Sequence, residues 1–317
     1  MTPRSLFDRT TLGGYPLLLR LTFVPCSRFH RLRHVPDLWP ARADVSLFWL
    51  CVRIHERLAL PVGDKNNRKR GVSRHNFTNR RLVINKMKTL GIIGGLGPES
   101  TLDYYQRIIA LYRERTGDRH YPEFVIVSVD LRKGLDFMDA NDLSGMANYL
   151  LEGIDKLARA GADFGIISAN TPHIVFDEVA PKSPIPLISI VEATRAAAKA
   201  QNLKRLALFG TRYTMRATFY PKVFARDGIE LLVPDSHGQD YIHDKYMNEL
   251  VPGRFLADTR AGLLNIVDRM KATSDIDGVI LAGTELPLIL RDPTHNGIPF
   301  LDTTKIHVEA AVAHMLS

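Results

Sequence analysis

From residue 87 to the end of the chain, short apolar runs alternate with longer amphipathic segments, and this alternation restricts the possible folds more than any other feature. The runs are rich in Ile and Val, as in GIIG at 91–94 and VIVSV at 125–129. The segments between them repeat apolar residues at about every third or fourth position, which is the period of a helix. Strands that are separated by helices pair in parallel and are covered on both faces. The sequence therefore predicts an α/β fold.

Strands are expected at 90–94, 124–129, 164–168, 186–190, 205–209, 229–233, 278–281 and 300–303. Helices are expected at 98–112, 146–160, 192–201, 219–227, 241–250, 258–273 and 305–315. The order of elements repeats, because the turns at 94–97 and 169–171 correspond to those at 210–212 and 283–285. Ligands of open α/β sheets bind beyond the carboxyl ends of the strands. We therefore expect two pseudo-symmetric, Rossmann-like halves that face one cleft, formed by 87–192 with 301–317 and by 193–300.

Residues 1–86 differ in composition from the rest of the chain. They hold 17 Lys and Arg against 5 Asp and Glu, whereas 87–317 hold 25 against 29, so the net charge of +8 originates in this leader. Its basic residues fit a tail for nucleic acid or membranes, or a transit peptide, but no helical or strand period is sustained. We expect a basic leader that is disordered or not part of the native protein, with a start at Met87.

The body from residue 87 carries no charge pattern that favours nucleic acid. No stretch of the chain has the roughly 18 apolar residues that a membrane span requires. We expect a cytoplasmic protein without a nucleic-acid or membrane partner. No His/Cys cluster has the spacing of a metal site, so none is expected.

Three segments carry most of the chemical information: GIIGGLGPES at 91–100, SANTPH at 168–173 and LAGTELP at 281–287. They resemble the three signatures of the aspartate/glutamate racemase family. GTRYTM at 210–215 and DTTKIH at 302–307 extend the resemblance, which covers essentially 87–317. It implies inversion of the α-carbon of aspartate, glutamate or a related amino acid without a cofactor. We also expect a homodimer.

The resemblance is incomplete at the two positions that matter most for the reaction. In the family the second signature reads Cys-Asn-Thr-x-His and the third reads Gly-Cys-Thr-Glu, whereas this chain has Ala169 and Gly283 at the thiol positions. Neither residue can titrate, so a mechanism that uses two thiols is excluded. We expect His173 and Glu285, one from each half, to act as the substitute acid and base. The alternatives are a supporting histidine near a helix start and a carboxylate that stabilises the first turn of a helix.

Other residues are expected to hold the substrate. The resemblance implies that Asn170, Thr171 and Thr284 bind the α-carboxylate, because hydroxyl and backbone N–H groups at helix starts bind anions. The resemblance likewise implies that Arg132, after the second strand, meets the side chain of an acidic substrate. Gly95 and Gly97, in the glycine turn, complete the expected substrate-binding set.

Two other classes of function fit parts of the sequence. The segment GLGPES at 95–100 is similar to a dinucleotide-binding G-x-G-x-x-G turn, which would indicate a nicotinamide-dependent oxidoreductase. Ser100 replaces the third glycine, and Asp130 follows Gly97 by 33 residues instead of about 20. The stronger alternative is a protein that keeps the cleft and binds a small carboxylate or amino acid without inverting it.

Overall fold

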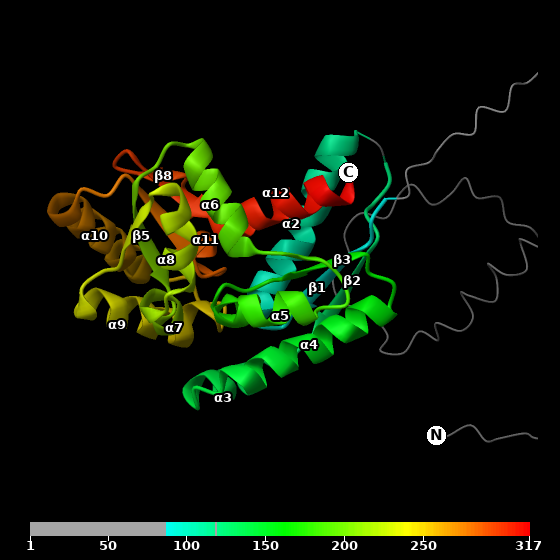
Figure 1. Ribbon diagram of the computed structural model, residues 1–317. Helices are drawn as coiled ribbons and strands as arrows, with labels where there is room; N and C mark the ends of the chain where they lie inside the picture. Colours follow the sequence, from blue (N-terminus) through cyan, green and yellow to red (C-terminus); the bar gives the residue numbers. More distant parts are fainter. Residues whose placement is uncertain (1–86, 118) are drawn as a thin grey trace, which may run out of the picture. The chain divides into compact units, whose positions relative to one another are not determined.

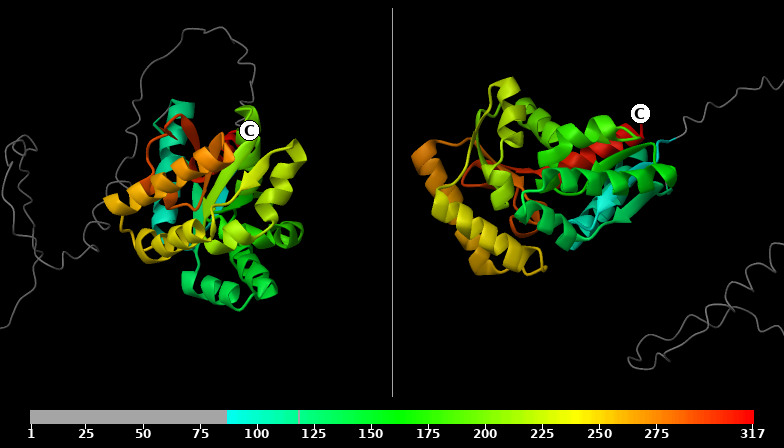
Figure 2. Two further views of the ribbon diagram at one scale, coloured as in Figure 1. Left: turned by 90° about the vertical axis from the view of Figure 1, so that its left-hand side faces the viewer. Right: turned by 60° about the horizontal axis from the view of Figure 1, so that its bottom comes forward.

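The computed structural model describes residues 87–317 except residue 118. The expected leader, 1–86, lies outside the described residues. From residue 87 onward the chain forms a pair of α/β halves that lie next to each other, with α9 and α10 at one end and α2 and α4 at the other (Figures 1 and 2). None of the helices at 87–317 is both long and apolar enough to cross a bilayer.

The first half is built on a four-stranded parallel sheet of order β2-β1-β3-β4. These strands are β1 (Leu90–Gly94), β2 (Phe124–Ser128), β3 (Phe164–Ile167) and β4 (Leu187–Ile188). The second half has a five-stranded sheet of order β6-β5-β7-β9-β8. It consists of β5 (Arg205–Gly210), β6 (Glu230–Leu232), β7 (Gly278–Ala282), β9 (Ile298–Asp302) and an antiparallel edge strand, β8 (Thr294–His295). The four parallel strands follow the same order in both sheets, so the predicted α/β fold with two similar halves is confirmed.

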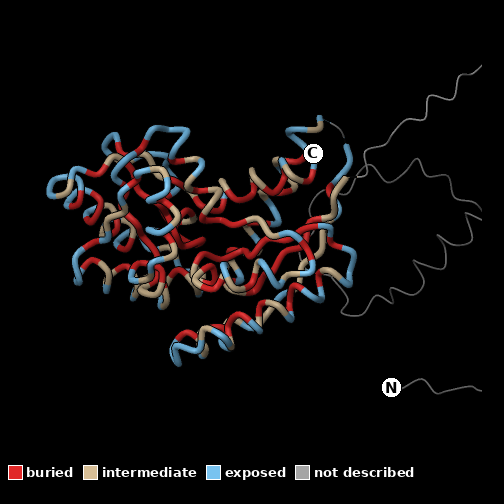
Figure 3. The backbone as a smooth tube through the Cα atoms, viewed as in Figure 1, coloured by how far each residue is buried: buried red, intermediate tan, exposed pale blue. Residues whose placement is uncertain are grey.

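Helices cover both faces of each sheet, and the central strands are buried (Figure 3). Around the first sheet lie α2 (Pro98–Thr116) and α12 (Thr303–Met315) on one face, and α4 (Leu143–Arg159), α3 (Leu131–Asp139), η2 (Thr171–Val175) and α5 (Phe176–Lys182) on the other. One face of the second sheet is covered by α6 (Ile190–Ala200), α8 (Phe219–Phe224) and η3 (Ala225–Asp227). Its other face is covered by α7 (Arg212–Arg216), α9 (Ser236–Lys245), η4 (Tyr246–Leu250), α10 (Ala257–Ser274) and α11 (Leu286–Ile289). Each half is therefore a sheet between two helical layers.

Several predicted boundaries were wrong. The helix α3 was not predicted, because its nine residues include Gly134 and its start depends on the Asp130 side chain, which accepts a hydrogen bond from the Arg132 N–H. The strand predicted at 186–190 is shorter, because α6 already begins at Ile190. The helix predicted at 241–250 begins five residues earlier, at Ser236, and its last turn is the π-helix η4.

The predicted limits of the halves also need correction. A boundary between 300 and 301 divides β9, whose Leu301 and Asp302 pair with β7 and so belong to the second sheet. A boundary between 192 and 193 divides α6. Ile190 and Val191 of this helix pack in the core of the second half, because an amphipathic helix buries its apolar face as one unit.

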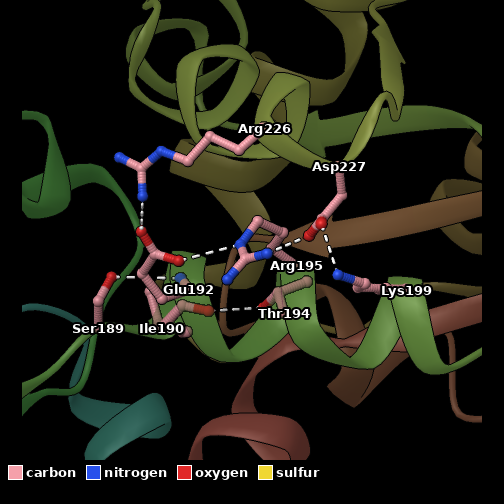
Figure 4. Close-up of polar contacts among 8 residues, drawn as sticks. All are labelled: Ser189, Ile190, Glu192, Thr194, Arg195, Lys199, Arg226 and Asp227. Atoms are coloured by element: carbon pink, nitrogen blue, oxygen red, sulfur yellow. Dashed lines mark hydrogen bonds and ion pairs between the residues drawn. The ribbon is translucent and has the colours of Figure 1, made fainter.

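Figure 4 shows how α6 is tied to the second half by polar contacts. The Ser189 hydroxyl accepts a hydrogen bond from the Glu192 N–H at the start of the helix. Asp227, at the end of η3, accepts hydrogen bonds from Arg195 and Lys199, and Arg226 donates to Glu192 at 2.6 Å. Ion pairs near the surface contribute modestly as single pairs, but here several charges share partners and connect α6 with η3.

The turn after β1 requires glycine at position 95. Gly95 has a φ of 83°, and a Cβ there would lie 2.2 Å from the carbonyl oxygen of Val129. Because the obstacle is backbone, the chain can accept a side chain at this position only by moving β2 or the turn.

We predict that Gly95→Ala lowers the free energy of unfolding by about 2–4 kcal/mol, the sum of left-handed strain and a steric overlap. The matched control is Gly228→Ala, where φ is 65° but nothing lies within 4 Å of the new Cβ, so only the conformational cost of about 1 kcal/mol is expected. Urea unfolding of both variants measures the difference. Equal losses would show that the Val129 contact imposes no cost.

Candidate active site

A pocket lies between the two halves, at the carboxyl ends of their central strands. It encloses about 560 Å³ of empty space, some of it open to solvent. The lining residues are Leu96, Leu131, Gly134, Leu135, Met138, Met146, Ala169, Asn170, Thr171, Pro172, Thr211, Tyr213, Tyr246, Met247, Val251, Ala282, Gly283 and Thr284.

The two positions where the family motifs have thiols both line this pocket. Ala169 follows β3 in the first half, and Gly283 follows β7 in the second. The repeated strand order brings them to one cavity, because β3 and β7 occupy the same place in their sheets. The two halves thus supply opposite motifs to one site, although neither residue carries a titratable group.

The side chain of Asn170 is buried and already engaged. Its amide nitrogen donates to the Thr303 hydroxyl at 3.1 Å, and its oxygen accepts from Tyr220 at 2.6 Å. Burial raises the pKa of Tyr220 far above its ordinary value, so this phenol keeps its proton and remains a donor. One N–H of the Asn170 amide is left for a ligand in the pocket.

Three threonine hydroxyls link the halves at the edge of the pocket. Thr171, from η2, lies 2.9 Å from Thr211 and 3.0 Å from Thr214, oxygen to oxygen, and the latter two are 3.2 Å apart. Each hydroxyl has a single proton to donate, so the cluster can close on itself or turn one proton toward a bound anion.

Tyr246 occupies the space beside Gly283. A Cβ at position 283 would lie 2.4 Å from Cε2 of the tyrosine ring, so the ring fills the volume that a side chain at 283 would need. The Tyr246 hydroxyl donates to the Glu285 carboxylate. Burial, followed by the nearby Glu285 carboxyl, raises the pKa of Tyr246 well above its usual range. The second wall therefore carries a phenol where the family motif has a thiol.

Glu285 lies behind Tyr246 and does not line the pocket itself. Its Oε2 accepts hydrogen bonds from Tyr246 and from Thr284, the latter at 3.0 Å. Its Oε1 is buried without a hydrogen-bond partner among the described residues and points at Gly97, where a Cβ would lie 2.3 Å away. Burial raises the pKa of Glu285, and this favours the neutral acid.

His173 is not placed to carry a proton in the pocket, contrary to our expectation. Its Nε2 accepts the Ile190 N–H at 3.2 Å, so Nδ1 bears the hydrogen and donates to the Ala169 carbonyl at 2.9 Å. The ring stacks on Phe176 and is absent from the lining residues. Burial, and then the nearby His307, lowers the pKa of His173 to about 3. Its role is to hold the Ala169 turn against the start of α6.

Arg132 also lies outside the pocket. Its side chain is 71% exposed and forms an ion pair with Asp136 at 2.7 Å. Residues 131, 135 and 138 turn toward the pocket, and position 132 is about 100° around the helix from 131. Arg132 also lies 3.9 Å from Asp139, the hydrogen-bond partner of the lining residue Tyr213, so its contact with an acidic substrate stays a prediction. Among the described residues no group of three His, Cys, Asp or Glu side chains is arranged to hold a metal ion.

The two glycines that were expected to bind the substrate shape the backbone of the turn instead. Gly95 and Gly97 are not lining residues, although Leu96 between them is.

Tyr246 and Thr211 were not predicted from the sequence. The internal repeat could have indicated Thr211, because the turn that contains this residue corresponds to the glycine turn of the first half. No local pattern pointed to Tyr246, because its contact with position 283 joins residues 37 positions apart.

We predict that Glu285 makes stability decrease as the pH rises. A carboxyl whose pKa is raised on folding contributes stability fully below its unfolded pKa, near 4.5, and loses it as the pH rises through the folded value. Glu285→Gln should remove this decline, which is at most about 1.4 kcal/mol per pH unit for one proton. Urea unfolding between pH 4 and pH 8 measures it, with Glu152→Gln, an exposed carboxyl on α4, as the control. An unchanged pH profile in Glu285→Gln would contradict the prediction.

Comparisons with known proteins agree with this geometry. The model of the Asp/Glu/Hydantoin racemase family matches residues 93–311. The broad specificity amino-acid racemase RacX of Bacillus subtilis is 26% identical over 231 residues, which cover 72% of this chain and 98% of that protein. The crystal structure of an aspartate racemase homologue from Pyrococcus horikoshii is 31% identical, with a TM-score of 0.63, and covers 73% of this chain and 100% of its own. An aspartate racemase from Picrophilus torridus shares the fold at 22% identity and a TM-score of 0.58, over 72% of this chain and 94% of its own. With a family model over more than half of its length and a site formed by the family's motifs, this chain belongs to the Asp/Glu/hydantoin racemase family.

Proposed function

We propose that this chain binds a small amino acid, either aspartate, glutamate or a related one, and exchanges the proton at its α-carbon. This is the reaction of an amino-acid racemase or epimerase. Family membership supports the class of reaction. The observation that carries the proposal is Tyr246, whose ring fills the space beside Gly283 and whose hydroxyl donates to Glu285. A homodimeric, cytoplasmic protein without a cofactor remains within the proposal.

The substrate carboxylate is proposed to bind at Asn170 and at the threonine hydroxyls. The free N–H of the Asn170 amide and one proton of the Thr171 cluster are the donors that this requires. Thr284 lines the same pocket, but its hydroxyl is directed to Glu285. Hydrogen bonds to a carboxylate are stronger than those between neutral groups, so a few donors suffice to orient the α-carbon.

Tyr246 and Glu285 together can move one proton. In the forward step the phenol oxygen takes the α-proton while its own proton passes to the ionised Glu285, and the electron pair of the C–H bond remains on the α-carbon and its carboxylate. The raised pKa of Glu285 makes it a stronger base once it is ionised. Return of the proton to the same face gives exchange. Inversion needs a second proton donor on the Ala169 wall, in addition to the hydroxyls that bind the carboxylate.

The alternative is a binding protein that does not invert its ligand. One observation favours it: Ala169 has no titratable group, and His173, the expected partner on that wall, faces the backbone instead. A single proton carrier on one wall can exchange a proton but lacks the opposed pair of a two-base racemase.

We predict that the protein exchanges the α-hydrogen of a bound amino acid for deuterium in heavy water, as followed by proton NMR. Tyr246→Phe keeps the ring and removes the hydroxyl, so it should reduce exchange at least about 100-fold, the usual contribution of a positioned acid or base. Binding should change little. Tyr241→Phe, which removes a phenol outside the pocket, is the control. Ligand binding with no exchange in the unchanged protein would establish the binding-only alternative.

We predict that the protein accommodates a cysteine at position 283 only when the ring of Tyr246 is removed. Gly283→Cys alone should destabilise the protein by about 1–3 kcal/mol, because the new Cβ meets the ring at 2.4 Å. Combined with Tyr246→Ala and Ala169→Cys it should fold and gain racemisation, measured by chiral chromatography. If Gly283→Cys alone is as stable as the unchanged protein, the ring does not hold that space.

A further inference from the structure

We propose that, within the class of substrates named above, the pocket selects a related amino acid with an uncharged, apolar side chain over aspartate and glutamate themselves. The inference rests on the proposed function, since it assumes that the pocket is the amino-acid site. Its basis is the separation of polar and apolar groups within the lining.

Apart from Tyr213 and Tyr246, whose hydroxyls donate to Asp139 and Glu285, the polar residues of the lining follow strand ends. Asn170, Thr171 and Thr284 lie directly after β3 and β7, where an α-carboxylate would bind. Away from the strand ends the wall is formed by α3 and its surroundings. Leu131, Leu135 and Met138 turn inward from that helix, since they repeat at the spacing of one helical face.

The rest of this end is apolar as well. Met146 from α4 and Met247 and Val251 from the region of η4 complete it. Among the described residues that line the pocket there is no Lys, Arg or His. A side chain that extends past the α-carbon would therefore meet methyl, methylene and thioether groups.

The cations nearest in sequence to the lining residues are already engaged elsewhere. Arg132 pairs with Asp136, Arg212 with Asp240 at 3.1 Å and Lys245 with Glu249 at 2.6 Å. The Lys133 ammonium lies 5.3 Å from the centre of the Tyr149 ring, and the Arg212 Nε is buried without a hydrogen-bond partner among the described residues. At the rim, Tyr213 donates to Asp139, and that carboxylate already forms an ion pair with Arg132 at 3.9 Å, so the rim adds no unpaired cation. A second carboxylate on the ligand would lose its water without gaining a cation, and such burial is costly.

Apolar side chains of different shape fit this lining. Three of the lining residues are methionines, Met138, Met146 and Met247, which adapt to irregular ligands because they are unbranched. At Gly134 a Cβ would lie 3.2 Å from Leu96, so α3 lies close to the glycine turn and closes this end of the pocket. Selectivity for apolar character, with tolerance of shape, is the expected result.

Isothermal titration calorimetry with both enantiomers of leucine, methionine, aspartate and glutamate tests the inference. Leucine or methionine should bind at least about ten times more tightly than either acidic amino acid. Leu135→Arg should reverse this order for glutamate by placing a cation inside the pocket. Arg132→Ala is the matched control on the exposed face of the same helix and should leave both affinities unchanged.

The outcomes separate the two proposals. Tighter binding of aspartate or glutamate by the unchanged protein, or loss of that binding in Arg132→Ala, would overturn the selectivity while the amino-acid site stands. Absence of binding for all eight ligands would overturn the proposed function together with the selectivity. Thermal unfolding checks that Leu135→Arg folds, and Leu131→Arg serves as a second variant from the same wall and should show the same reversal.

Discussion

The buried carboxyl group of Glu285 is the constraint on which the site depends. It comes from the second half and lies against Gly97 of the first, so a side chain at 97 would collide with it. Burial of a carboxyl is tolerated when it is neutral or hydrogen-bonded. Thr284 and Tyr246 supply two hydrogen bonds, and the raised pKa provides the neutral form. The position of Tyr246 in turn leaves no room for a side chain at 283.

The two halves are similar in topology and different in chemistry. Both sheets have the same order of parallel strands, and both central strands end at the pocket. On one wall a phenol and a carboxyl are coupled next to Gly283. On the other, Ala169 carries only a methyl group, and its carbonyl is held by His173. Two walls with the same topology therefore carry different groups, a hydrogen-bonded phenol and carboxyl on one and a methyl group on the other.

Several residues that were expected to act on the substrate or to bind it also hold the walls of the pocket in place through hydrogen bonds. His173 binds the Ala169 turn to the start of α6, and Asn170 connects η2 with Tyr220 and Thr303 of the other elements. The Thr171 cluster joins η2 to α7. These contacts are hydrogen bonds between buried groups, and they orient the lining more firmly than surface ion pairs could.

The sequence by itself determined the α/β class, the two similar halves and the motifs that line the pocket, because hydrophobic period and turn residues act over short distances. Ala169, Asn170, Thr171, Gly283 and Thr284 all reach the pocket, since each directly follows a strand whose end must lie there. Only the tertiary structure decided which way side chains point. Arg132 turns outward and His173 turns to the backbone because of helix phase and the packing of α6. Tyr246 enters the site from a π-helix far along the chain, and its fit beside Gly283 is a contact between η4 and the turn after β7, a long-range contact that no local pattern encodes.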